Sequence, residues 1–431
     1  MVKKWLNHKK RSWQSEFAKN MRTLMVGTIL SQLIVVAFIP ILSRIFTPED
    51  FTTLEQFTMV LNILVVVITG KYEFAIMHPK EKEDARHIVF LAVLLAMIGS
   101  ILVLLFGLVF QDGIGKYYNN QDFGHYFWML GPALFAFAIF NIVSYWFSRQ
   151  KEYAVTSKSK IINSTISEPL KFGFAKLNIG SIGLVIGTTI GQILSGIYSF
   201  ICFRQNEPLG LTKISKDRLK KNALRYKDYP TISIWGSILN RLAQWAHIGI
   251  FTQFYGLAAI AWMALSRRVI QAPLNILSGS YSQVFFQKIS EIDDPNILKT
   301  QYYKALKQLS MFAFLIIAIV FLIPNTTIGW VFGEAWMPAI QYMRVLTVWY
   351  AINFVTSSLS FVSLRIEIQK ISFLLDLIHF VFVYGTIFVA YKLDFDAYHA
   401  TVLLVAAKVI YFTINIFVQS IRLNRYVNEK K

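Results

Sequence analysis

Hydrophobic residues along the chain are grouped in long runs, and short stretches of polar and charged residues separate one run from the next. A helix needs about 20 consecutive apolar residues to cross a membrane. Twelve runs approach or exceed that length, although Glu168, Pro169 and Lys171 interrupt one of them. We predict membrane-spanning helices near 24–43, 53–70, 87–110, 126–147, 157–176, 180–203, 229–252, 256–280, 305–323, 338–362, 370–391 and 399–421.

The composition agrees with this pattern. Of the 431 residues, 55% are hydrophobic and 16% are charged, whereas a soluble domain has about 25% charged residues. Twelve spanning helices occupy about 240 residues, which leaves no room for a large soluble catalytic domain. The predicted fold class is therefore an all-α polytopic membrane protein with about 12 transmembrane helices.

The charge distribution predicts the orientation in the membrane. The net charge of +19 comes from 43 Lys and Arg against 24 Asp and Glu, and basic loops stay in the cytoplasm. With both termini inside, the inner segments and the span ends that adjoin them hold 33 of the basic residues, and the outer loops with their adjoining span ends hold 4. We therefore expect cytoplasmic tails at 1–23 and 422–431, the first being a tail rather than a removed signal peptide. The basic excess indicates topology and not a nucleic-acid surface.

A basic connection divides the chain into two halves. Residues 204–228 contain eight Lys and Arg and follow the sixth predicted span. We predict a six-helix bundle at 24–203, a cytoplasmic linker at 204–228 and a second six-helix bundle at 229–421. Such halving is typical of transporters built from repeats.

Polar residues follow one face of several predicted spans. In the span 256–280 and just beyond it, polar residues recur at helical steps of 4, 4, 3 and 4, and Arg268 lies at the edge of the same face. These residues are Arg267, Gln271, Asn275, Ser278 and Ser282. The span 229–252 repeats the pattern with Ser233, Ser237, Asn240, Gln244 and His247, flanked by Arg241. A thinner stripe in the second span contains Glu55, Thr58, Asn62 and Thr69.

Two interpretations of these stripes remain open. Polar side chains can join helices through interhelical hydrogen bonds, or they can line a water-filled cavity. For Arg241, Arg267 and Arg268 we favour a cationic cavity, because the nearby spans offer few acidic partners.

Other ionisable residues within the spans are expected to form local pairs. Glu168 and Lys171, three positions apart, predict an internal ion pair beside Pro169. Asp376 and His379 have the same spacing and indicate either a hydrogen-bonded core pair or a proton relay. Lys408 is expected to face the cavity or to reach toward Asp376.

The sequence lacks the motifs of an ATP-driven or metal-dependent protein. It contains no Gly-x-x-x-x-Gly-Lys-Ser/Thr phosphate-binding loop and no His, Cys and carboxylate spacing typical of a metal site. Its single cysteine, Cys202, excludes an internal disulfide and a cysteine-based metal site. We therefore expect a transporter that has no fuel domain, no cofactor and no metal.

Several short segments resemble the O-antigen and capsule polysaccharide flippases, the polysaccharide branch of the multidrug/oligosaccharidyl-lipid/polysaccharide (MOP) exporter superfamily. The matches run in the expected order from about 24 to 370, most of the chain, while the last two spans give no specific match. Thr52 stands at a position where the family usually has glycine. The matching segments are Ile41–Phe51, Lys71–Ile76, Tyr229-Pro230, Phe254–Gly256, Arg267-Arg268 with Pro273, Ser282–Phe286 and Phe332–Trp336.

The resemblance implies both architecture and substrate. It implies two six-helix bundles around a central cavity lined by the first, second, seventh and eighth spans. The implied activity is the transfer of undecaprenyl-diphosphate-linked oligosaccharide from the cytoplasmic to the outer leaflet of a bacterial cytoplasmic (inner) membrane. Polysaccharide polymerase machinery and membrane lipids are the implied partners, and nucleic acid is not expected.

Within that mechanism we assign provisional roles to the polar residues. Arg241, Arg267 and Arg268 are predicted to bind the diphosphate, because guanidinium groups match phosphate oxygens. Residues predicted to bind sugar hydroxyls are Asn62, Asn240, Gln244, Gln271 and Asn275. Candidates for coupling to an inward ion are Glu55, Glu168 and Asp376.

Three alternatives remain open. A cation-coupled exporter of small molecules would favour an acidic or aromatic cavity over arginines. A membrane glycan polymerase or glycosyltransferase would need a larger outer loop than any predicted here. A non-transporting scaffold for glycan assembly would have less need of arginines within the membrane.

Overall fold

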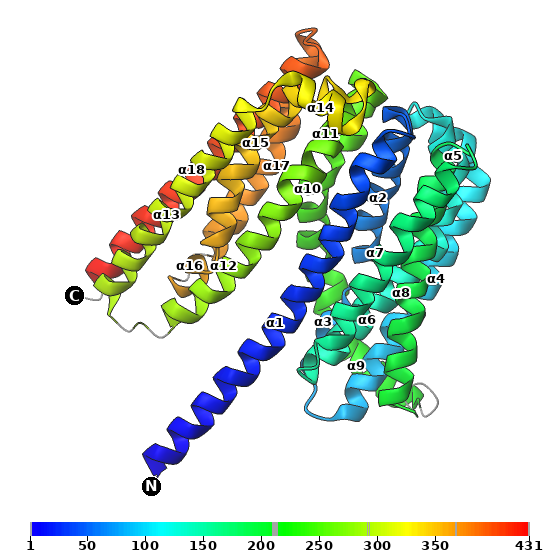
Figure 1. The fold of residues 1–431 in the computed structure, drawn as a ribbon. Helices are drawn as coiled ribbons and strands as arrows, with labels where there is room; N and C mark the ends of the chain where they lie inside the picture. The colour runs from blue at the N-terminus through cyan, green and yellow to red at the C-terminus, as the bar shows by residue number, and fades with distance from the viewer. Residues whose placement is uncertain (1, 209–213, 291, 293, 367–368, 430–431) are drawn as a thin grey trace. The chain divides into compact units, whose positions relative to one another are not determined.

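A computed structural model describes residues 2–208, 214–290, 292, 294–366 and 369–429. In this part of the chain the regular structure consists of helices, and no residue is in a β-strand (Figure 1). Every one of the twelve predicted spans falls on helical segments. The predicted all-α class is confirmed.

The longer helices correspond to the predicted spans, and short helices connect several of them. The longer ones are α1 (Val2–Ser43), α2 (Pro48–Ile68), α4 (Lys82–Tyr117), α6 (Leu130–Arg149), α7 (Ala154–Ala175), α8 (Ser181–Asn206), α10 (Ile234–Tyr255), α11 (Leu257–Ser266), α12 (Ala272–Ser290), α13 (Pro295–Leu322), α15 (Ala339–Ser358), α17 (Gln369–Lys392) and α18 (Ala397–Glu429). The shorter ones are α3 (Tyr72–Ala75), α5 (Gln121–Tyr126), η1 (Phe127–Met129), α9 (Lys216–Arg225), η2 (Tyr229–Ser233), η3 (Arg267–Gln271), α14 (Asn325–Phe332), η4 (Glu334–Trp336) and α16 (Val362–Arg365). Within the described residues, seven helical segments are long and apolar enough to cross a membrane.

The chain forms two compact units. Unit 1 contains Met1–Leu42 and Gln56–Trp245, and unit 2 contains Ser43–Glu55 and Ala246–Lys431. The start of α2 therefore packs with unit 2, and the start of α10 packs with unit 1. The division at the linker 204–228 into bundles 24–203 and 229–421 stays a prediction.

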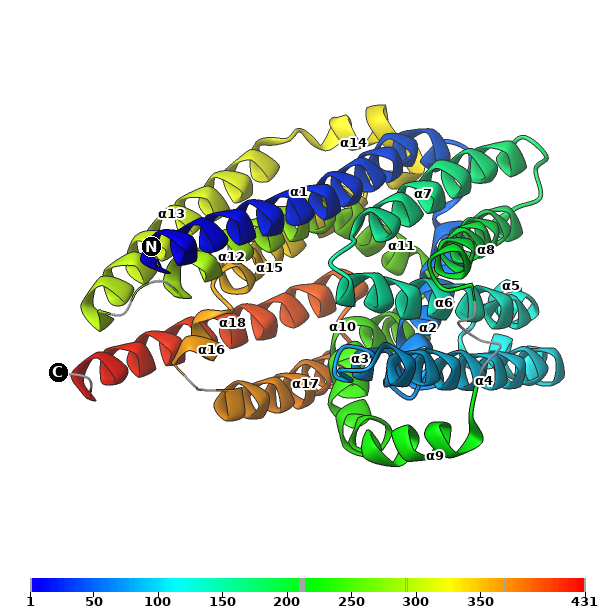
Figure 2. The same cartoon turned by 90° about the horizontal axis from the view of Figure 1, so that it is seen from below.

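Small residues bring the helices of unit 1 close together. Helices α4, α6, α7 and α8 pack in pairs (Figures 1 and 2). A Cβ atom added to Gly196 of α8 would lie 2.8 Å from the Ala136 carbonyl oxygen of α6. A Cβ atom added to Gly187 would lie 2.7 Å from Cγ of Lys171 on α7. Membrane helices associate through such close backbone approaches, because lipid supplies no hydrophobic driving force between them.

The predicted ion pair on α7 is confirmed. Lys171 Nζ lies 2.7 Å from Glu168 Oε1, and both side chains are buried. Ser167 also donates a hydrogen bond to the same carboxylate oxygen, at 3.2 Å. Mutual pairing explains how two charges are accommodated in a helix beside Pro169.

Unit 2 is built around α15. This helix packs against α11, α12, α13 and α18, and α17 packs against α18. Its buried residues include Leu346, Tyr350 and Phe354, and Leu404 of the neighbouring helix α18 is buried as well. The apolar character on nearly all sides of α15 fits a helix enclosed by other helices.

Two predicted spans contain a wider, π-helical turn. The η2 turn precedes α10 and includes Pro230. The η3 turn lies between α11 and α12, and Pro273 is the second residue of α12. Proline lacks the backbone N–H that an α-helix requires, so a neighbouring turn must rearrange. Single π-helical turns occur frequently at functional sites, and η3 carries Arg267 and Arg268.

The close approach of α7 and α8 generates a stability prediction. A Cβ atom at Gly191 would lie 2.7 Å from Cβ of Ser167 and 3.0 Å from the Asn163 carbonyl oxygen, whereas Gly173 of α7 has open space around it. Gly191→Ala should lower the unfolding temperature in detergent, because overpacking costs about 1–3 kcal/mol. Gly173→Ala should leave it unchanged or raise it, because alanine favours helix by about 1 kcal/mol. Equal effects of the two variants would contradict this packing.

Candidate functional site

A buried carboxylate in unit 2 binds two arginines. Glu55 has no exposed side-chain surface, although it lies on a membrane helix. Its Oε2 accepts a hydrogen bond from Arg267 Nη2. Its Oε1 accepts from Arg268 Nε at 3.0 Å and from Arg268 Nη2 at 2.5 Å. One carboxylate thus faces two guanidinium groups, and the Glu55–Arg267–Arg268 cluster keeps one net positive charge.

Contacts of the segment Ser43–Glu55 hold this carboxylate in place. Trp336 Nε1 donates to the Ser43 carbonyl at 2.8 Å, and the Trp336 ring meets Phe51 edge-on at 5.0 Å. Thr52 Oγ1 donates to the Leu257 carbonyl at 2.6 Å. Thr52, the residue that departs from the family pattern, therefore ties the start of α2 to the start of α11.

The surroundings of the two arginines are aromatic. The Arg268 guanidinium lies 5.4 Å from the centroid of the Phe51 ring. Tyr350 of α15 is buried and interacts electrostatically with Arg267 and Glu55. Aromatic walls lower the local polarity and strengthen the ion pairs beside them.

The pairing of Glu55 was not part of the sequence interpretation. We expected few acidic partners for the arginines and treated Glu55 as a separate coupling candidate. The structure instead makes Glu55 the shared partner of Arg267 and Arg268. The two arginines are largely buried but keep 26% and 17% of their side-chain surface exposed.

A second basic group occurs in unit 1. Lys71 lies in the turn between α2 and α3, and its Nζ donates a hydrogen bond to Ser237 Oγ of α10. Arg241, one turn further along α10, acts electrostatically on Lys71. Burial lowers the pKa of Lys71, Glu73 opposes that shift and Arg241 adds to it. Arg241 was predicted as a site residue, whereas Lys71 was noticed only as part of a motif.

The remaining predicted site residues differ in environment. The Asn62 side-chain amide donates a hydrogen bond, 2.8 Å long, to the Thr58 carbonyl of its own helix. Gln271 is partly buried, and Gln244 and Asn275 are exposed. The side chains of Asn240 and Asp376 lie outside the described residues. The proposed contact between Lys408 and Asp376 stays a prediction, and Lys408 Nζ lies 4.1 Å above the Trp349 ring.

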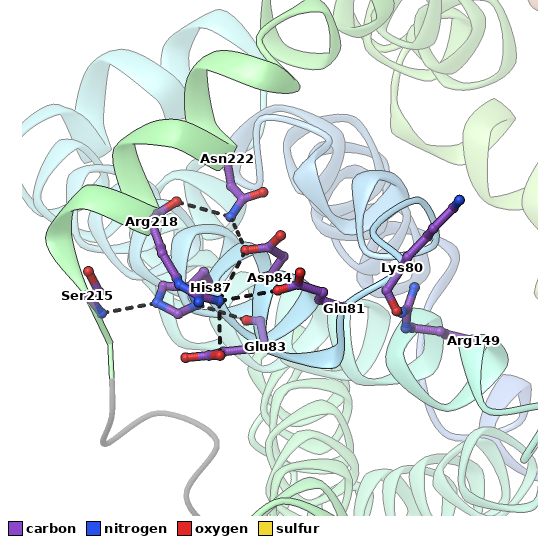
Figure 3. Close-up of polar contacts among 9 residues, drawn as sticks. All are labelled: Lys80, Glu81, Glu83, Asp84, His87, Arg149, Ser215, Arg218 and Asn222. Carbon is purple, nitrogen blue, oxygen red and sulfur yellow. Dashed lines mark hydrogen bonds and ion pairs between the residues drawn. The ribbon is translucent and has the colours of Figure 1, made fainter.

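The linker helix α9 is held against the start of α4 by a polar cluster (Figure 3). Arg218 Nη1 lies 2.9 Å from Glu83 Oε2 and 3.4 Å from Glu81 Oε2. The Asn222 side chain donates to Asp84 Oδ1 at 3.0 Å. These contacts pair a basic helix with the acidic start of α4.

His87 completes this α9–α4 contact. It is buried, its Nδ1 lies 2.8 Å from the Glu83 carbonyl oxygen, and its Nε2 accepts from the Ser215 backbone N–H at 3.0 Å. Both ring nitrogens are used by a neutral imidazole protonated on Nδ1. The three carboxylates at 81, 83 and 84 within a basic loop were the available sequence signal for this contact.

The described residues contain no group of three or more His, Cys, Asp or Glu that could hold a metal ion. The chemical capacity of the two basic groups is instead the binding of anions, because arginine and lysine donate charge-assisted hydrogen bonds to phosphate and carboxylate oxygens.

Comparison with known families settles the membership of the chain. A sequence profile described as polysaccharide biosynthesis protein matches residues 41–341. The chain belongs to the polysaccharide biosynthesis protein family. The matched region includes Glu55, Lys71, Arg241, Arg267 and Arg268, and the resemblance noted from the sequence motifs is confirmed. Among curated proteins no match is found.

Solved structures of the MOP superfamily share the fold of this polysaccharide biosynthesis protein. The lipid II flippase MurJ in an inward closed conformation is 11% identical, with a TM-score of 0.67 over 94% of this chain and 89% of that chain. An inward-facing multidrug resistance MATE family transporter is 14% identical, with a TM-score of 0.65 over 93% and 95%. A MOP superfamily transporter from Pyrococcus furiosus, described as having a binding pocket of reverse polarity, is 14% identical, with a TM-score of 0.61 over 95% and 96%. At these identities the likeness shows the fold alone.

Removing the shared carboxylate of unit 2 should destabilise the protein. Glu55→Ala leaves two guanidinium groups without their anion, and breaking a buried ion pair costs about 3–5 kcal/mol. The unfolding temperature in detergent should fall strongly. Glu49→Ala, an exposed position in the first turn of the same helix, should cost less than about 1 kcal/mol. A wild-type unfolding temperature for Glu55→Ala would show that the arginines do not depend on this carboxylate.

The α9–α4 contact leads to a prediction on local opening. Arg218→Ala removes the ion pairs to Glu81 and Glu83, each of which is partly exposed, so about 1 kcal/mol of local stability should be lost. Amide hydrogen exchange in α9 should rise about fivefold. Lys220→Ala, at an exposed position of α9, is the control. Exchange that is equal in both variants would mean that other contacts hold the helix.

Proposed function

We propose that this polysaccharide biosynthesis protein is a flippase for undecaprenyl-diphosphate-linked oligosaccharide, moving it from the cytoplasmic to the outer leaflet by alternating access. The observation that carries the proposal is the Glu55–Arg267–Arg268 cluster, a net positive group on membrane helices of a family named for polysaccharide biosynthesis. The fold shared with a lipid II flippase supports a lipid-linked substrate.

The chemistry of such a substrate fits this cluster. A lipid-linked sugar carries a diphosphate and a hydrophilic glycan that cannot cross hydrocarbon, while its polyprenyl tail can remain in lipid. Guanidinium groups bind phosphate oxygens in a bidentate manner. Glu55 orients Arg267 and Arg268 before the substrate arrives, so that less side-chain entropy is lost on binding.

Glu55 also supplies a route for ion coupling. A diphosphate that binds Arg267 and Arg268 competes with the carboxylate for the same donors. A proton taken up by Glu55 would then neutralise the carboxylate that has lost its arginine partners. Of the other two coupling candidates, Glu168 already pairs with Lys171 and the Asp376 side chain is outside the described residues.

The remaining predicted residues take supporting roles in this proposal. Arg241 keeps its predicted role as a residue that binds phosphate oxygens. Sugar hydroxyls are bound by the amides of the predicted stripes, namely Asn62, Asn240, Gln244, Gln271 and Asn275.

The proposed orientation places both termini in the cytoplasm of a bacterium, with the protein in the cytoplasmic (inner) membrane. Export of a diphosphate from an inside-negative cell gains about 2.3 kcal/mol per charge per 100 mV, or about 4–5 kcal/mol for two charges. The membrane potential can therefore favour export without ATP. A polysaccharide polymerase at the outer face is the proposed consumer of the exported glycan.

A flipping assay tests the proposal. The variant Glu55→Gln/Arg267→Gln/Arg268→Gln removes all three charges together and so leaves no buried charge unpaired. In proteoliposomes containing a fluorescent diphosphate-linked oligosaccharide lipid, wild-type protein should expose the label in the opposite leaflet. The triple variant should lose at least about 90% of that rate, equivalent to about 1.4 kcal/mol.

Arg422→Ala, at an exposed position of α18, should flip the lipid at the wild-type rate. Normal flipping by the folded triple variant would exclude the cluster as the diphosphate site. Absence of flipping by correctly oriented wild-type protein would contradict the substrate and favour a small-molecule exporter or a scaffold.

A further inference from the structure

The turn between α2 and α3 has an unusual backbone. Gly70 and Lys71 both adopt positive φ angles, 56° and 58°, although lysine rarely occupies the left-handed region. Hydrogen bonds hold the turn, from the Gly70 amide to the Val67 carbonyl at 3.0 Å and from the Tyr72 amide to the Thr69 carbonyl at 3.2 Å. The strained conformation points Lys71 toward α10, where it meets Ser237. Retained strain of this kind clusters at functional sites.

The group that Lys71 joins is rich in donors. Lys71 Nζ donates to the Ser237 hydroxyl rather than to a carboxylate. Its ammonium also lies 4.2 Å from the centroid of the Phe74 ring, which in turn lies 4.7 Å from the Tyr145 ring. Arg241 acts electrostatically on both Lys71 and Tyr145. Two cations and a serine hydroxyl therefore gather within unit 1, an arrangement suited to a multivalent anion.

Glu73 is the carboxylate next to this group. Its side chain is buried at 6% relative exposure. Its Oε2 has no hydrogen-bond partner among the residues that the structure describes. Burial raises the pKa of Glu73, while the Thr69 hydroxyl, its own backbone and Lys71 oppose the shift. A buried, half-satisfied carboxylate is unstable as an anion and gains from taking up a proton.

Most other titratable groups on the elements that pack against α3 are engaged in contacts of their own. Helices α4 and α6 and the η2 turn pack against α3. Helix α4 carries Arg86, whose Nε has no hydrogen-bond partner among the described residues, and His87, which is used in the contact with α9. From α6 come Tyr145, which interacts with Glu73, and Arg149, which donates to the Ile76 carbonyl at 3.2 Å. From η2 comes Tyr229, whose hydroxyl lies 2.6 Å from His78 Nε2. Lys71 is thus the cation that acts on Glu73.

We propose that Lys71, Ser237 and Arg241 bind a phosphate-class anion, and that Glu73 is a competing carboxylate whose protonation sets the affinity of this site. Ionised Glu73 attracts Lys71 and repels an incoming anion. Neutral Glu73 does neither, so anion binding and proton uptake are linked. If the proposed function holds, on which the identity of the natural ligand rests, the anion is the diphosphate of the lipid-linked sugar.

Binding of inorganic pyrophosphate to the full-length protein in detergent, followed by calorimetry over a pH series, tests this site. As the pH rises, the affinity of the wild-type protein for pyrophosphate should fall by up to about tenfold per pH unit more than the affinity of Glu73→Gln does. The reason is that binding is linked to the uptake of one proton. The comparison isolates Glu73, since the protonation of pyrophosphate itself is the same for both proteins. Lys71→Met should weaken binding at least about tenfold, the loss of one charge-assisted contact.

Control variants separate charge from folding. Lys71→Arg retains the charge and should bind pyrophosphate, and Lys80→Met, at an exposed position between α3 and α4, should bind as wild type. Unfolding temperatures verify that each variant is folded. Wild-type affinity in folded Lys71→Met, or a wild-type pH dependence in Glu73→Gln, would overturn the proposal.

The triple glutamine variant at 55, 267 and 268 distinguishes this inference from the proposed function. Proton-linked pyrophosphate binding should persist in that variant, because its substitutions lie in unit 2. Loss of all binding there, with normal binding in Lys71→Met, would assign the anion to unit 2 and refute the site at Lys71. Intact binding at Lys71 without any lipid flipping would refute the flippase assignment alone.

Discussion

The burial of Glu55 is the constraint on which the arrangement of unit 2 depends. A carboxylate without exposed surface in a membrane helix is costly unless cations meet it. Arg267 and Arg268 meet it from a sequence distance of more than 200 positions. To bring them there, the chain must dock the start of α2 on α11 and η4, and the contacts of Thr52 with Leu257 and of Phe51 with Trp336 do so. The ion cluster therefore explains why the residues Ser43–Glu55 belong to unit 2 and not to the rest of α2.

Unit 1 also contains charged side chains away from solvent, but their partners are different. Lys71 is matched by a hydroxyl and an aromatic face, and the neighbouring carboxylate Glu73 retains an unsatisfied oxygen. A saturated cluster favours structural rigidity, whereas an incompletely satisfied one responds to protons and ligands. The two units thus present basic groups of different character, one preorganised by its counter-ion and one sensitive to the charge of its neighbour.

Much of the fold could be predicted from the sequence, because the apolar runs that form membrane helices are local in the chain. The Glu168–Lys171 pair was predictable for the same reason, since three positions on a helix fix the distance. The pairing of Glu55 with Arg267 and Arg268 was not, because the spacing on one helix does not identify the helix that faces it. Lys71 and Glu73 were also overlooked as site residues. The positive φ angles of Gly70 and Lys71 direct Lys71 toward α10, and apart from Gly70 nothing in the local sequence predicts them.

The π-helical turn at Arg267–Gln271 has a consequence for how later residues of this span are oriented. A π-turn accommodates one residue more than an α-turn, and one residue corresponds to a rotation of about 100°. Every side chain after Gln271 is therefore rotated relative to a straight α-helix continued from α11. Deletion of one residue within this turn would restore regular α-geometry and would leave the polar face of α12 in its present direction, whereas a return to α-geometry at unchanged length would rotate that face by about 100°. The wider turn therefore determines which way Asn275 and the residues beyond it point.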